Sequence, residues 1–245
     1  MLTQPYVVNL SSIIQLGKIF PDGIQAFVTL CDESPGWFAS YPGLFRMTNY
    51  AWVSFQCYRH TKTIDDYKKE LMNTDQFINE LLNIFYFLKD KTDGRQLLVN
   101  AWNATINWDA ESTARVRKLF SQANNLPIYF ISNTNPLNFQ KIMEFLRVNI
   151  SEIQWNENIQ IPERQIDDPK PVEIAPNIFV CLSFHYGLFK TPGLIENVID
   201  HLGTEITLIS QFEDDLKTAS ILGVSPANIH TAPQFYENSR NDLTL

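Results

Sequence analysis

Residues 126–136 read LPIYFISNTNP, and the prediction of the fold starts from them. A short apolar run bounded by Pro and by polar residues predicts a buried strand. The run ends at Ser132, and small polar side chains follow it directly. A serine at the tip of a buried strand is typical of a place where a protein holds a ligand. The stretch therefore predicts a core strand and a candidate binding residue at its end.

Helix and strand patterns alternate on both sides of this run from about residue 110 onward. Asp109 is a candidate N-cap for a helix over residues 109–120 (DAESTARVRKLF). Further helices are expected over 137–147, 193–203 and 212–223, and further strands over 177–183, 205–210 and 227–231. Strict alternation implies a parallel sheet covered on both faces. The predicted fold class is α/β, a doubly wound parallel sheet.

The part of the chain before residue 110 lacks this alternation of helix and strand patterns. Residues 23–34 (GIQAFVTLCDES) are interpreted as the first strand of the sheet. Residues 63–71 and 75–90 have capping and apolar patterns typical of helices, which predict a small bundle. We therefore expect a core made of residues 20–40 and 110–232, a helical cap over 41–109, and a C-terminal tail over 233–245. A cap inserted after the first strand is expected over the carboxyl ends of the strands, where ligands bind in open α/β sheets.

Composition excludes several classes of function. The net charge of −8 and the absence of a basic block argue against a nucleic-acid groove. No apolar run is long enough for a membrane span. The three cysteines form neither a disulfide framework nor a metal-spacing pattern, so a reducing cytoplasm is the expected compartment.

Three stretches carry a resemblance to a known family. Residues 98–135 (LVNAWNATINWDAESTARVRKLFSQANNLPIYFISNTN), 181–203 (CLSFHYGLFKTPGLIENVIDHLG) and 207–224 (TLISQFEDDLKTASILGV) follow one another in the order of three family motifs. The chain resembles the haloacid dehalogenase-like (HAD-like) hydrolase superfamily, in the branch with a helical cap, over residues 24–231. The resemblance is good in the second and third motifs and poor in the first and fourth.

The resemblance implies a site that binds an anion, and in the family such a site serves phosphatase chemistry. Phosphatases of this family attack phosphorus with an Asp at the end of the first strand and bind Mg²⁺ through acidic residues of the fourth motif. Ser132 matches the second-motif residue that holds phosphoryl oxygens, with Asn133 beside it. Lys190 matches the third-motif Lys, although Thr191 follows it where the family usually has Pro. The implied ligand is a small anion, such as a phosphoryl or carboxylate group.

The first and fourth motifs depart from the family. Alignment on the apolar run of residues 23–34 puts Leu30 at the nucleophile position and Asp32 at the acid/base position. Ser210 and Gln211 fall where the metal-binding carboxylates belong. The leading hypothesis is therefore a degenerate protein without Mg²⁺-dependent phosphatase activity, which keeps an anion pocket at Ser132, Asn133 and Lys190. No metal site or cofactor is predicted, and Mg²⁺ is expected only if the family chemistry survives.

Two alternatives remain open. A shift of register makes Asp32 a nucleophile with Ser34 two residues later, as in the metal-independent dehalogenases of the superfamily. Ser210 and Asp215 have the spacing of the fourth motif in those enzymes, with Asp215 near the attacking water. The other alternative is an interaction protein that binds a protein partner through its cap.

Overall fold

The computed structural model describes residues 4–16, 24–32, 42–68, 71–157, 159, 169–187 and 191–237. The chain divides into two compact units. An α/β unit comprises residues 1–15, 108–135 and 142–245, and a helical unit comprises residues 16–107 and 136–141. Within the described ranges, no helix has the length and apolar character needed to cross a membrane.

A six-stranded sheet forms the centre of the α/β unit, with the order β5-β6-β4-β1-β7-β8. The strands are β1 (Tyr6–Asn9), β4 (Ile128–Ser132), β5 (Val172–Ala175), β6 (Ile178–Leu182), β7 (Thr207–Ser210) and β8 (Ile229–Thr231). All neighbouring strands are parallel except the edge strand β5, which pairs antiparallel with β6. The predicted α/β fold class with a parallel sheet is confirmed.

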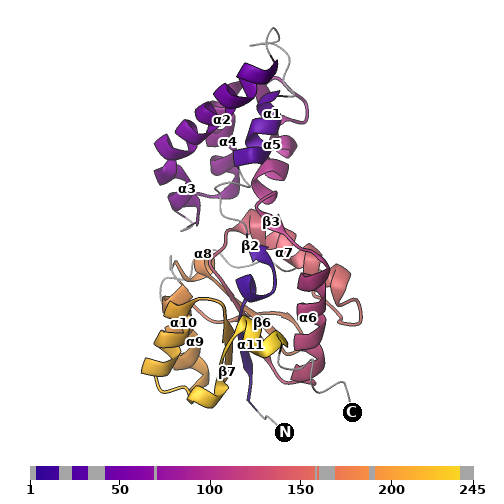
Figure 1. The fold of residues 1–245 in the computed structure, drawn as a ribbon, viewed down its shortest axis with the longest axis vertical. Helices are drawn as coiled ribbons and strands as arrows, with labels where there is room; N and C mark the ends of the chain where they lie inside the picture. The colour runs from indigo at the N-terminus through magenta and orange to yellow at the C-terminus, as the bar shows by residue number, and fades with distance from the viewer. Residues whose placement is uncertain are drawn as a thin grey trace. The chain divides into compact units, whose positions relative to one another are not determined.

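Helices cover both faces of this sheet. The helices of the unit are η1 (Leu10–Ser12), α6 (Ala110–Ala123), α7 (Pro136–Asn149, whose first turns belong to the helical unit), α8 (Ser183–Tyr186), α9 (Thr191–Leu202), α10 (Glu213–Ile221), η4 (Pro226–Asn228) and α11 (Ala232–Glu237). Figure 1 shows α9 and α10 on one side of the strands and α6 on the other. Val7, Tyr129 and Leu208 pack against α9 and α10. Phe130, the next residue along β4, meets Phe120 of α6, as the alternation of side chains along a strand requires.

The helix ends follow the signals in the sequence. The Asp109 carboxylate accepts a hydrogen bond of 2.8 Å from the Ser112 backbone N–H and so caps α6. That bond lowers the pKa of Asp109. Gly203, which has a φ of 80°, and Gly223, which has a φ of 94°, follow α9 and α10. Their left-handed backbone terminates each helix at low steric cost.

The helical unit has a core of its own. Its elements are α1 (Ile24–Asp32), α2 (Pro42–Arg59), α3 (Thr61–Lys68), α4 (Thr74–Ile84), η3 (Tyr86–Leu88) and α5 (Gly94–Asn103). Two short strands, β2 (Gln15–Leu16) and β3 (Ile106–Asn107), form a separate two-stranded sheet. Aromatic rings fill the centre of the bundle: Tyr67 and Phe77 stack with ring centroids 4.0 Å apart, and Trp102 meets both edge-on.

The prediction of a first strand within residues 23–34 is wrong. Residues 24–32 form the helix α1, and the strand that begins the sheet is β1, at residues 6–9. Ile24, Phe27, Val28 and Cys31 have the i, i+3, i+4, i+7 spacing of an apolar helix face, while Gln25 and Thr29 are exposed. The apolar run therefore packs as a helix in the core of the helical unit, and residues 24–32 are not part of the sheet.

Candidate functional site

Three neighbouring strands of the sheet end in a polar residue at the same edge. Asn9 ends the central strand β1, Ser132 ends β4, and Ser210 ends β7. The register aligns Asn9 with Ile131, one residue before Ser132, and aligns Val8 with Ile209, one residue before Ser210. All three side chains are at least 99% buried. This carboxyl edge is the place where ligands bind in open α/β sheets, so it is the candidate site.

A buried carboxylate joins two of these strand ends. Asp215, in the first turn of α10, is fully buried. Its Oδ2 accepts a hydrogen bond of 2.7 Å from Asn9 Nδ2 and one of 2.6 Å from Ser210 Oγ. Ser210 Oγ accepts in turn from the Phe212 backbone N–H at 3.1 Å. The carboxylate is thus held by two neutral donors from the ends of β1 and β7.

The other end of the Asn9 side chain is also engaged. Asn9 Oδ1 accepts from the Ser11 backbone N–H at 3.1 Å and from the Ser11 hydroxyl. These bonds cap the turn η1, which follows β1. From α6, Arg115 Nη1 donates to the Ser12 carbonyl oxygen at 3.2 Å and fixes the end of the same turn. Both the amide nitrogen and the amide oxygen of Asn9 therefore form hydrogen bonds within the site.

The segment after β4 carries two buried hydroxyl groups without a partner. Within the described part of the chain, Ser132 Oγ and Thr134 Oγ1 form no hydrogen bond. The backbone of Thr134 is clamped: its N–H donates to Ser183 Oγ at 3.0 Å, and Ser183 Oγ donates to its carbonyl oxygen at 2.9 Å. The hydroxyl groups thus lie on a fixed backbone, and their hydrogen-bonding capacity is available to a ligand.

The described part of the chain includes some of the candidate residues named from the sequence. Ser132 and Asp215 lie at this edge, and Asn133 is exposed directly after Ser132. Lys190 lies outside the described residues.

The assignments to the first motif are wrong. Leu30 and Asp32 belong to α1 in the helical unit, and Leu30 is buried in the core of that bundle. Neither residue ends a strand of the sheet, so neither can take the nucleophile position. Asn9 is the residue that ends the central strand, with Ser11 two residues later. The dehalogenase alternative, which needs Asp32 at the end of the first strand, loses its basis.

Sequence reasoning missed Asn9 and Ser11. The signal for them is short: YVVNLSS, at residues 6–12, has only three apolar residues before the polar ones. It nevertheless has the same pattern as IYFISN at residues 128–133, in which an apolar run is followed directly by small polar side chains. Only the second of these segments is predicted to be a strand; in the structure both form parallel strands, so the two changes meet at one edge of the sheet.

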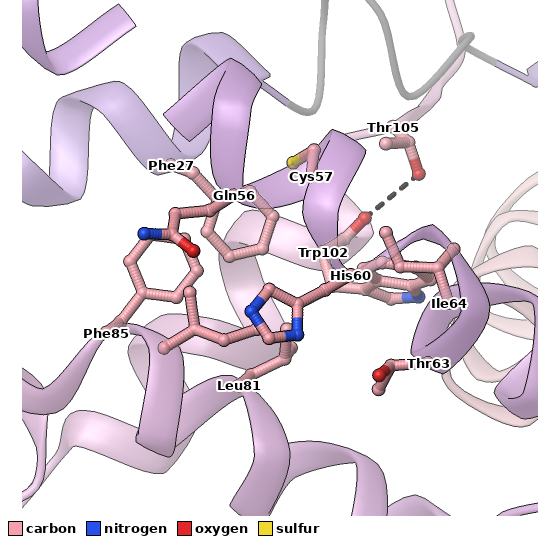
Figure 2. Close-up of a pocket in the computed structure, with 11 residues that line it drawn as sticks. Phe27, Gln56, Cys57, His60, Thr63, Ile64, Leu81, Phe85, Trp102 and Thr105 are labelled. Carbon is pink, nitrogen blue, oxygen red and sulfur yellow. Dashed lines mark hydrogen bonds between the residues drawn. The ribbon is translucent and has the colours of Figure 1, made fainter. Parts of the chain in front are cut away.

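The helical unit contains a separate pocket, shown in Figure 2. Phe27, Leu81, Phe85 and Trp102 form most of its walls, and the His60 ring is turned into it. Burial raises the pKa of the Cys57 thiol, which also lines the pocket, to about 11. Since an anion needs cationic or hydrogen-bonding partners, this apolar pocket is not the expected anion site.

Comparison with known proteins identifies the fold. No protein-family model matches the chain, and no curated protein matches it. Among solved structures, a HAD family enzyme of Bacteroides thetaiotaomicron matches with a TM-score of 0.61 and 15% identity over 98% of both chains. The same enzyme in complex with magnesium and inorganic phosphate matches with a TM-score of 0.58 and 16% identity over 93% of both chains. A predicted HAD-like family hydrolase of Porphyromonas gingivalis matches with a TM-score of 0.54 and 18% identity, over 100% of this chain and 97% of the other. The chain has the fold of HAD family enzymes.

The fold family implies Mg²⁺, and the residues present do not fit that ion. Mg²⁺ requires near-octahedral oxygen ligands and is usually held through one or two carboxylates. Here Asp215 Oδ2 already accepts two hydrogen bonds, and Asn9 Oδ1 is occupied by Ser11. Gln211, which follows β7, is exposed and carries no charge. Within the described ranges, no group of three or more His, Cys, Asp or Glu residues could hold a metal ion.

Proposed function

We propose that this chain is a HAD-like protein that binds a small anion at the carboxyl edge of its sheet and does not hydrolyse phosphate esters with Mg²⁺. The observation that carries the proposal is the side chain at the end of β1. An amide, Asn9, stands there and donates its N–H to the carboxylate of Asp215 at 2.7 Å.

An amide in this position removes covalent catalysis. A carboxylate nucleophile offers a lone pair on a charged oxygen, whereas the Asn9 nitrogen is conjugated with its carbonyl and its oxygen accepts two bonds from Ser11. Loss of the nucleophile from a cooperating catalytic site typically costs about 10⁶-fold in rate. Asp215 does not replace it, because its Oδ2 serves as an acceptor for both Asn9 and Ser210.

The segment after β4 supports binding of an anion. A buried hydroxyl without a partner costs about 1–3 kcal/mol, and a bound anion removes that cost by accepting a hydrogen bond from it. Ser132 and Thr134 offer two such hydroxyls on one clamped segment. We assign the positive charge that such a site needs to Lys190, the match to the third-motif Lys, which lies outside the described residues. That charge is required because Asp215 carries a negative charge at the same edge.

Catalysis is tested with the intact protein, Mg²⁺ and a panel of phosphate esters. We expect no release of phosphate above the level of a heat-inactivated sample. Release that requires Mg²⁺ and disappears in Asp215→Asn would refute the catalytic half of the proposal, because it would show that Asp215 serves chemistry. Release that is unchanged in Asp215→Asn marks a contaminating phosphatase.

Anion binding is tested separately by calorimetric titration with inorganic phosphate, sulfate and acetate. We expect saturable binding that weakens at least about fivefold in Ser132→Ala, the loss of one hydrogen bond to a charged group. Ser220→Ala, an exposed serine of α10, is the matched control and should bind like the unmodified protein. Equal affinities of the two variants would reject the pocket at Ser132, whatever the outcome for catalysis.

A further inference from the structure

One face of the helical unit presents aromatic side chains to solvent. On α2, Phe55 is 55% exposed and Tyr58 is 79% exposed, and Ala51 is exposed one turn before Phe55. Tyr50, also exposed, lies beside Ala51. Figure 1 shows α2 at the edge of the helical unit, with α1, α4 and α5 to one side of it. An exposed cluster of large apolar side chains is typical of an interaction site, whereas single ones are normal on any surface.

The face continues into α3. His60 N–H donates to the Gln56 carbonyl oxygen at 2.9 Å, and Ile64 N–H donates to the His60 carbonyl oxygen at 3.2 Å. These i to i−4 bonds carry the helical path across the junction of the two helices. Residues 51, 55, 58 and 62 are spaced by four, three and four, so they share one side of this path. We call Ala51, Phe55, Tyr58, Arg59 and Lys62 the outer face.

Two cations border the aromatic side chains of the outer face. Arg59 and Lys62 are both exposed, and within the described ranges neither side chain forms an ion pair or a hydrogen bond. The sequence contains no Asp or Glu between Glu33 and Asp65. In a chain of net charge −8, this stretch is locally basic. Two copies of this face would repel each other, and the overall negative charge opposes docking on an anionic membrane.

We propose that the outer face is a docking site for an acidic segment of another protein. Apolar side chains of that segment cover Phe55 and Tyr58, and its carboxylates pair with Arg59 and Lys62. Aromatic residues at the centre supply most of the binding energy of such an interface, and charges at its rim select the partner and speed association. This surface lies within the helical unit, so the inference is independent of the anion pocket in the α/β unit.

The test uses the intact protein and a labelled synthetic peptide, followed by fluorescence anisotropy. The probe is an amphipathic helix of about 18 residues with Leu at i, i+3, i+4 and i+7 and Glu on both flanks. A second peptide carries Lys in place of every Glu. The test variant is Tyr58→Ser/Lys62→Glu. The matched control is Leu71→Ser/Lys89→Glu, which makes the same kinds of change at exposed positions of the helical unit outside the outer face. Circular dichroism checks that both variants remain folded.

We expect the acidic peptide to bind, the Lys peptide to bind at least about tenfold more weakly, and added salt to weaken binding. The test variant should lose at least about tenfold in affinity, and the control should lose none. The inference is overturned if the acidic peptide does not bind, if both peptides bind equally, or if the control variant loses as much as the test variant. Binding to phosphatidylglycerol vesicles that the test variant abolishes would identify a lipid surface instead. A dimer in sedimentation that the test variant dissociates would identify a second copy, and either result would overturn the inference.

Discussion

The substitution Asn9→Asp tests the interpretation of the site most directly. It places an Asp at the end of the central strand, where the family resemblance implies one, and changes the size of the side chain very little. In this protein it also replaces the N–H that Asn9 donates to Asp215 with a second carboxylate oxygen. The substitution therefore turns a hydrogen bond into a contact between two like charges in a fully buried place.

The magnitude follows from the 2.7 Å separation of Asn9 Nδ2 and Asp215 Oδ2. Two negative charges at that distance repel by about 6 kcal/mol at an effective dielectric constant of about 20. Taking up one proton at pH 7 costs about 4 kcal/mol, because an unperturbed Asp has a pKa of about 3.9 and each unit is about 1.4 kcal/mol. Protonation costs less free energy than the charge repulsion, so the folded variant binds one proton, shared between the introduced carboxyl group and Asp215. We expect Asn9→Asp to lower the free energy of unfolding by about 4 kcal/mol at pH 7 and by about 1.5 kcal/mol at pH 5.

Proton linkage decides whether the stability of the variant rises or falls with pH. The folded variant binds a proton that its unfolded chain releases above about pH 4, so its stability falls as the pH rises. Urea denaturation at pH 5, 6 and 7, followed by far-UV circular dichroism, measures the difference from the unmodified protein. Asn100→Asp, at an exposed position of α5, is the control and should change stability by less than about 0.5 kcal/mol at any pH. A variant at position 9 whose loss is the same at pH 5 and pH 7, or is absent, would refute the reasoning.

Three further predictions address other parts of the structure. Ser210→Ala removes the 2.6 Å bond to Asp215 and should lower the free energy of unfolding by about 1.5–3 kcal/mol in the same assay; no loss would mean that the carboxylate does not need this donor. Gly94→Ala should cost about 1–3 kcal/mol, because a Cβ at Gly94 would lie 2.0 Å from the Leu88 carbonyl oxygen; unchanged thermal stability would contradict that close approach. Alkylation of Cys57 by iodoacetamide, followed by mass spectrometry, should accelerate about tenfold per pH unit from pH 8 to pH 10, since burial raises its pKa to about 11 and the thiolate reacts; a plateau by pH 9 would contradict this.

Periodicity predicted most of the α/β unit because the strands there are buried and the helices have one apolar face. The run over residues 128–132 is confirmed as β4, and the predicted N-cap of α6, Asp109, bonds to Ser112 as expected. Gly203 and Gly223 end their helices because their positive φ angles suit glycine. Local signals decide these features, and a single sequence contains them.

The start of the sheet could not be predicted in the same way. Residues 24–32 are apolar enough for a buried strand, and the helical spacing of their apolar residues becomes decisive only once Gln25 and Thr29 are seen to be exposed in the folded bundle. β1 has four residues, and its place in the sheet depends on pairing with β4 and β7, far away in sequence. Long-range pairing of this kind leaves only a short local pattern, the change from apolar to polar residues within 6–12. The error at the first strand therefore moved the candidate nucleophile position from Asn9 to Leu30.

The pairing of β1 with later strands has a consequence during synthesis on the ribosome, because β1 is made long before its partners. Asn9 and Asp215 are separated by 206 residues along the chain, so at about 5–20 residues per second a ribosome takes roughly 10–40 s to make the second after the first. β1 lacks β4 until residue 132 has been made, and by then residues 16–107 of the helical unit have been synthesised. A nascent chain halted before β7 would expose the Tyr-Val-Val strand to other unfinished chains. Chaperones that shield extended apolar segments would find a target in β1 while its partner strands are still missing.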